Sequence, residues 1–139
     1  MNLRAVVFGF VVLLAATLNF GFFFGEIDNP AHHDVYELFA AVLVTLLATV
    51  LKFGDRTHLG AVHLATSLVA DLQLIAAVVI WAYATLVSAE GLTIGTTTVM
   101  ASMSGGALIA NLVSVLLLVV ETTSFQPGWA RSRAARGAD

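Results

Sequence analysis

Cysteine is absent from this chain of 139 residues, and only 11% of its residues are charged. Without thiol groups the chain has no disulfides, no thiolate chemistry and no Cys-based metal or iron–sulfur site. A soluble domain carries about 25% charged residues. The shortage of charge, together with a hydrophobic content of 59%, therefore indicates a protein that lies in a lipid bilayer.

Several sequence motifs of known chemistry are also missing. The chain has no HExxH metal motif, no TVGYG-like potassium filter and no regularly spaced arginines of a voltage sensor. Ser104-Gly105-Gly106 lies inside an apolar run, so we interpret it as a helix-packing feature and not as a phosphate loop. We therefore expect no enzyme activity and no cofactor. The six basic residues do not favour nucleic-acid binding.

Four apolar stretches dominate the chain and predict an all-α membrane protein, a bundle of four transmembrane helices. We place the spans at about residues 3–24, 35–53, 61–86 and 97–120, within a transmembrane domain of residues 1–124. The first span is longer than the roughly 7–15 apolar residues of a signal peptide, which favours a retained helix. Asn29-Pro30 is a helix-start signal and predicts that the second helix begins at Pro30. Residues 125–139 form a basic tail.

The positive charges predict the topology of the bundle. All six Lys and Arg residues fall on one side of the four spans: Arg4, Lys52, Arg56, Arg131, Arg133 and Arg136. Because such residues are retained in the cytoplasm, we expect both termini and the hairpin at residues 54–59 to be cytoplasmic.

The opposite side is acidic and carries no fixed cation. It holds Glu26, Asp28, Asp34 and Glu37, which we interpret as an outer acidic mouth. His33 and Glu37 stand four positions apart and would share a helix face, so they are candidate metal ligands. The alternatives are a solvated acidic cap and pH sensing by the histidines.

The third span carries an acid, Asp71, near its middle. A charge at that depth costs roughly 2.5–3.5 kcal/mol on insertion scales. On a helical projection the polar residues of this span fall within an arc of about 160°; they are His63, Thr66, Ser67, Asp71, Gln73 and Thr85. The opposite side is apolar and predicted to face lipid: Leu64, Leu68, Leu72, Ile75, Val79, Tyr83 and Leu86.

The second and fourth spans each have a distinct face. On the second span Glu37, Ala41, Thr45, Ala48 and Lys52 share one side, as either a packing seam or a pathway lining. A lysine near a helix end can reach the interface, so the position of Lys52 is compatible with a membrane span. The fourth span repeats a polar residue every seven positions, with two more on one flank: Thr97, Ser104 and Asn111, then Ser114 and Glu121. Asn111 would lie at about the depth of Asp71.

Three interpretations of Asp71 remain open. It is a structural acid bonded to polar side chains of neighbouring helices, a cation or proton site, or a contact to a partner subunit. The first functional hypothesis is a cation or proton channel or transporter subunit that acts as a homo-oligomer. Its pathway residues would be Asp71, Gln73, Asn111, Ser67, Ser104 and His63. The alternative is a non-catalytic accessory subunit of a larger membrane complex.

Two stretches, NPAHHDVYELFAA at residues 29–41 and LKFGDRTHLGAVHLATSLVADLQL at residues 51–74, carry a family resemblance. They resemble a family of small bacterial inner-membrane proteins with four helices and no assigned function. The resemblance implies a multi-pass protein of the bacterial inner membrane. It supports the fold class and adds no site residue.

Overall fold

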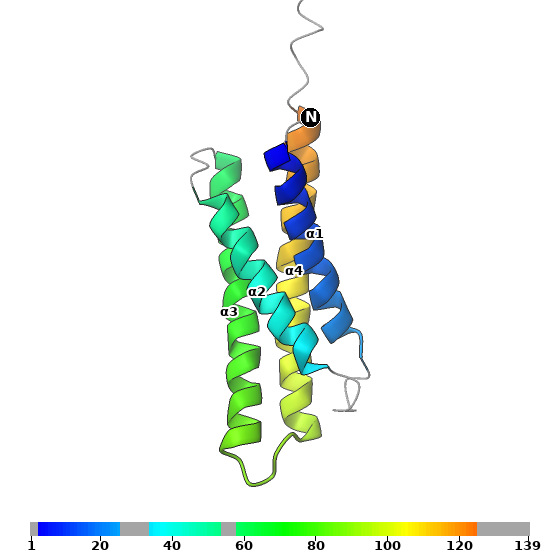
Figure 1. The fold of residues 1–139 in the computed structure, drawn as a ribbon, viewed down its shortest axis with the longest axis vertical. Coiled ribbons are helices and arrows are strands. Elements are labelled where there is room, and N and C mark those ends of the chain that lie inside the picture. Colours follow the sequence, from blue (N-terminus) through cyan, green and yellow to red (C-terminus); the bar gives the residue numbers. More distant parts are fainter. Residues whose placement is uncertain (1–2, 26–33, 54–57, 125–139) are drawn as a thin grey trace, which may run out of the picture.

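The structure is a computed structural model, which describes residues 3–25, 34–53 and 58–124. Within these ranges the chain is all-α, with four helices and no strand: α1 (Leu3–Phe23), α2 (Val35–Lys52), α3 (His58–Leu86) and α4 (Ile94–Ser124). Figure 1 shows them as an up-and-down bundle. Each helix is long and apolar enough to cross a membrane, which agrees with a multi-pass membrane protein.

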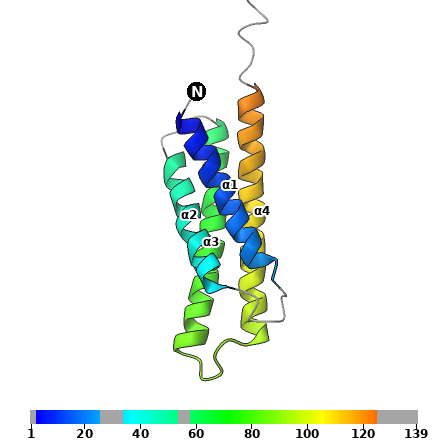
Figure 2. The same cartoon turned by 45° about the vertical axis from the view of Figure 1, so that its right-hand side comes forward.

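The helices differ in length, so the two ends of the bundle are not formed by the same helices. At 1.5 Å per residue, the 18 residues of α2 reach about 27 Å and the 31 residues of α4 about 47 Å. A hydrocarbon core is about 30 Å thick. The α3–α4 pair therefore extends past α1 and α2 at the end of the bundle where α3 turns into α4 (Figures 1 and 2).

The start of α2 differs from the prediction. Asp34 has an extended backbone, and its side chain accepts a hydrogen bond of 2.8 Å from the Tyr36 N–H, as an N-cap does. A continuous helix from Pro30 is therefore wrong. The proposed start signal, Asn29-Pro30, lies outside the described residues. A carboxylate at this position also suits the positive end of the helix dipole.

The start of α1, the end of α2 and the end of α4 lie at the same end of the bundle (Figure 1). These are the helix ends next to which the sequence carries its lysine and arginine residues. The fold is thus compatible with the charge pattern. The direction of the bundle relative to the cell stays a prediction of that pattern.

Small and apolar side chains fill the space between the helices. The main core is made of Phe22, Leu38, Ala41, Ala70, Leu74, Ala77, Met100, Ala107 and Ala110. The predicted lipid face of α3 is exposed from Leu68 to Leu86, and Leu64 is half-buried. On α2 the predicted face is turned inward, with Ala41, Thr45 and Ala48 buried. It therefore packs against the neighbouring helices.

Candidate functional site: a buried charged cluster between α2, α3 and α4

Lys52 lies inside the bundle, not at its surface. Only 4% of this residue is exposed. Its Nζ donates hydrogen bonds to the hydroxyls of Ser67 on α3 and Ser114 on α4, the latter at 3.0 Å. Lys52 does not reach toward the interface, although its place near the helix end would allow this, because it shares the inward face of α2 with Thr45 and Ala48 and is held by polar partners there.

Asp71 faces the same helix seam and is 6% exposed. The hydroxyl of Thr49 on α2 donates a hydrogen bond of 2.6 Å to its Oδ2. Its Oδ1 is buried and accepts no hydrogen bond from the residues that the structure describes. Asp71 and Lys52 form no direct ion pair, but they are close enough for their opposite charges to attract each other.

Two side-chain hydrogen bonds thus join α2 to α3, one helix turn apart. Lys52 bonds Ser67, and Thr49 bonds Asp71. Thr49 and Lys52 are three positions apart, while Ser67 and Asp71 are four positions apart, so each pair lies on one face of its helix. This spacing lets both bonds form across a single contact.

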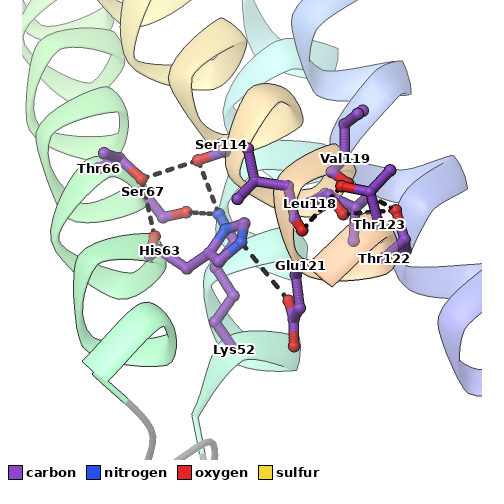
Figure 3. Close-up of polar contacts among 11 residues, drawn as sticks. Lys52, His63, Thr66, Ser67, Ser114, Leu118, Val119, Glu121, Thr122 and Thr123 are labelled. Atoms are coloured by element: carbon purple, nitrogen blue, oxygen red, sulfur yellow. Dashed lines mark hydrogen bonds and ion pairs between the residues drawn. The ribbon is translucent and has the colours of Figure 1, made fainter. Parts of the chain in front are cut away.

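The cluster continues from Lys52 into the contact between α3 and α4. The hydroxyls of Ser114 and Thr66 are 2.8 Å apart and share a hydrogen bond. Thr66 also bonds the backbone carbonyl of His63, one turn back along α3, at 2.9 Å. Figure 3 shows these groups as one connected set between the helices.

A histidine and a glutamate lie at the end of this set. His63 Nε2 is 3.9 Å from Glu121 Oε2; the His63 side chain is 4% exposed and the Glu121 side chain 31%. The ring of Phe8 on α1 packs edge-on against His63 at 6.0 Å between centroids. The same ring lies 5.9 Å from the Lys52 ammonium. Phe8 therefore packs against both His63 and Lys52.

Other predicted pathway residues lie elsewhere in the interior. Ser104 bonds the backbone carbonyl and the side-chain oxygen of Asn19 on α1, at 3.2 and 3.3 Å. Gln73 lies against the backbone of Gly106. Asn111 is buried, and its Nδ2 has no hydrogen-bond partner among the described residues. No hydrogen bond in the described part of the chain joins any of these three residues to Asp71.

The polar repeat of α4 is turned inward. Thr97, Ser104, Asn111 and Ser114 are all buried, and Glu121 at the end of the row is half-buried. The polar arc of α3 is buried at His63, Ser67 and Asp71. It does not include Thr85, which is exposed and donates to the carbonyl of Trp81 at 2.8 Å.

The outer acidic mouth is described only in part. Glu26, Asp28 and His33 lie outside the described residues, so the mouth and the His33–Glu37 metal pair stay predictions. Asp34 caps α2, and the Glu37 carboxylate packs against Gly21 of α1. The described residues contain no group of three or more His, Asp or Glu side chains able to hold a metal ion.

Sequence reasoning missed five polar members of the cluster. Lys52 was considered able to reach the interface, and Thr49, Thr66, Ser114 and Glu121 were given no site role. Lys52 carried a usable signal, because it falls in register with the small residues Ala41 and Ala48 on the face expected to pack. No sequence pattern pointed to Thr49, although it lies four positions from Thr45, because its partner Asp71 is on another helix.

The sequence comparison decides the family. A family of unknown function, DUF6394, matches residues 32–122. The chain belongs to the DUF6394 family. This confirms the resemblance to a family without an assigned function. No curated protein and no solved structure matches the chain.

The DUF6394 match covers most of the candidate site but not the part supplied by α1. It includes Lys52, Asp71, Ser114 and Glu121, together with all of α2 and α3. It begins after α1, which supplies Phe8 and Asn19. The charged part of the cluster thus lies wholly in the matched region.

Proposed function

We propose that this DUF6394 protein handles protons in the membrane, as a subunit of a proton channel or proton-coupled transporter, and that Asp71 is the group that exchanges the proton. The observation behind the proposal is the placement of Asp71 and Lys52 near each other inside the bundle, within a set of hydroxyl side chains. Ionisable side chains inside membrane helices commonly mark ion paths and proton relays.

The geometry favours a proton over a metal cation. A hard metal cation needs about six to eight oxygen ligands that replace its water shell. Asp71 instead has one hydroxyl bonded to it and the Lys52 ammonium nearby, which would repel a second cation. A proton needs no such shell. It needs a titratable group and neighbours that can pass hydrogen bonds along.

The site is enclosed within a single chain. Because Asp71 faces the seam between α2 and α3, no oligomer is required to shield it from lipid. We therefore place the proposed proton path inside each four-helix bundle. A homo-oligomer remains part of the proposal as an assembly of such bundles, without a shared central pore lined by Asp71.

A flux assay tests this function. The purified protein is reconstituted into liposomes containing a pH-sensitive dye, and a potassium diffusion potential drives proton uptake. We expect uptake above that of protein-free liposomes, and its loss in Asp71→Asn. Thr85→Val is the matched control, because Thr85 is an exposed hydroxyl residue on the same helix. Wild-type uptake no faster than in empty liposomes, or full activity of Asp71→Asn, would overturn the proposal.

The alternative proposal is an accessory subunit of a larger membrane complex. Small residues of the helix faces, such as Ala41, Ala48 and Gly106, contact other helices of the same chain. A partner would then bind the apolar outer surface. Mass measurement of the gently solubilised native complex separates the two proposals. A stable hetero-complex supports the accessory function, and a lone chain or homo-oligomer counts against it.

A further inference from the structure

The buried cluster approaches the protein surface at Glu121. This side chain is 31% exposed, whereas its neighbour His63, 3.9 Å away, is 4% exposed. Lys52, Ser67 and Ser114 farther along the set are all buried. Exposure therefore falls from Glu121 to His63 and Lys52, so Glu121 is the ionisable member of the cluster that lies nearest the surface.

The position of Glu121 along α4 agrees with this role. The helix is about 47 Å long, which exceeds a hydrocarbon core of about 30 Å. Glu121 lies in the last turn of α4, at the end of the bundle that also holds the start of α1. A carboxylate there can lie in the polar interface, in contact with water, while its partner His63 faces the interior.

From His63 a series of groups with exchangeable protons leads inward. Thr66 bonds the His63 carbonyl and shares a hydrogen bond with Ser114, and Ser114 accepts one from Lys52. Among the described side chains, the charged or titratable ones in this set are Lys52 from α2, His63 and Asp71 from α3, and Glu121 from α4. From α1 the ring of Phe8 closes the side of the set next to Lys52 and His63.

We propose that Glu121 and His63 form the site through which protons from water reach the buried Asp71. The inference rests on the proposed proton-handling function and names its point of access. The Glu121 carboxylate takes a proton from a hydronium ion and becomes neutral. It then passes this proton to His63 Nε2 and is again a carboxylate.

Rotation of the His63 ring brings the proton to the hydroxyls of Thr66 and Ser114, each of which accepts one proton and releases its own. The Lys52 ammonium gives a proton to the Asp71 carboxylate, which becomes neutral, and Lys52 regains a proton from Ser114. The geometry gives each residue one role. Glu121 exchanges protons with water, His63 carries them past the ring of Phe8, and the two hydroxyls link His63 to Lys52, which passes a proton to Asp71.

Infrared spectroscopy after a pH jump tests this route without requiring net transport. The signal is the C=O stretch of the protonated Asp71 carboxyl, assigned by its absence in Asp71→Asn. We expect Glu121→Gln to slow the appearance of this band by about 100-fold, the scale of one lost proton-transfer group. Thr122→Val is the matched control, because Thr122 is exposed and bonds only carbonyls of its own helix. Glu121→Asp should restore part of the rate.

The outcomes separate this inference from the proposed function. An unchanged Asp71 response in Glu121→Gln, with normal wild-type flux, overturns the access site alone. A slowed response in a protein without flux supports the access site and overturns the transport function. Absence of an Asp71 band in the wild-type protein at every pH overturns the inference. Because His63 is buried and its replacement can disturb folding, Thr66→Val serves as the second variant and should also slow the response.

Discussion

The Thr49 hydroxyl donates to the Asp71 carboxylate across 2.6 Å, between two helices that each carry one side of the contact. Within the described part of the chain, this is the one hydrogen bond that the carboxylate receives from a side chain, and its other oxygen has no partner there. A buried carboxylate without hydrogen bonds is costly. Thr49 therefore both satisfies the buried carboxylate of Asp71 and helps to fix the register of α2 against α3.

Replacing Thr49 with valine keeps the shape of the side chain and removes the donor. We expect the free energy of unfolding to fall by about 1–3 kcal/mol, the cost of leaving a buried acceptor unsatisfied. This exceeds the roughly 0.6 kcal/mol average for hydrogen bonds in membrane proteins. Unfolding in mixed micelles measures the change. Thr49→Ser keeps the hydroxyl and should retain most of the stability, so equal losses in both variants would contradict the prediction.

Lys52 and Asp71 should be energetically coupled although they do not touch. Lys52→Met and Asp71→Asn each leave one buried charge without its opposite, so each single variant should be less stable than the wild type. The double variant removes both charges. We expect a coupling free energy of about 0.5–3 kcal/mol in a double-mutant cycle. Strictly additive effects would show that the two charges do not interact.

Two adjacent glycines of α4 should differ in their tolerance of alanine. A Cβ at Gly105 would lie 2.7 Å from the ring of Phe23, whereas at Gly106 it would meet the flexible amide end of Gln73 at 2.5 Å. A ring cannot bend away, so Gly105→Ala should cost about 1–3 kcal/mol of unfolding free energy. Gly106→Ala should cost less.

Gly95→Ala is the control for this comparison, because its nearest neighbour would be an ordinary contact at 3.7 Å from Thr93. It should change stability by no more than about 0.5 kcal/mol. The same unfolding measurement applies to all three variants. A larger loss in Gly106→Ala than in Gly105→Ala would reverse the expected order.

The absence of cysteine permits a direct test of the predicted topology. Ala89, in the turn between α3 and α4, and Thr123, near the end of α4, are both exposed. In right-side-out vesicles an impermeant maleimide should label Ala89→Cys. It should label Thr123→Cys only after the membrane is opened. The opposite pattern would show that the bundle is inserted the other way round.

Much of the fold could be predicted from the sequence because the bilayer imposes simple rules. A helix needs about 20 apolar residues to cross it, and this length rule predicted the number and approximate positions of the four helices. The lipid face of α3, with Leu72 and Val79 exposed, followed from helical periodicity alone. The start of α2 was placed too early, because the Asn29-Pro30 signal concealed the better cap at Asp34.

The sequence by itself determined which residues are polar within each helix and that Asp71 must face away from lipid, since local periodicity sets the direction of every side chain. Only the tertiary structure decided which polar groups meet. Thr49 reaches Asp71, Lys52 turns inward to Ser67 and Ser114, and Ser104 pairs with Asn19. Such partners depend on how helices rotate and slide against one another, and the packing of small residues between helices fixes that arrangement.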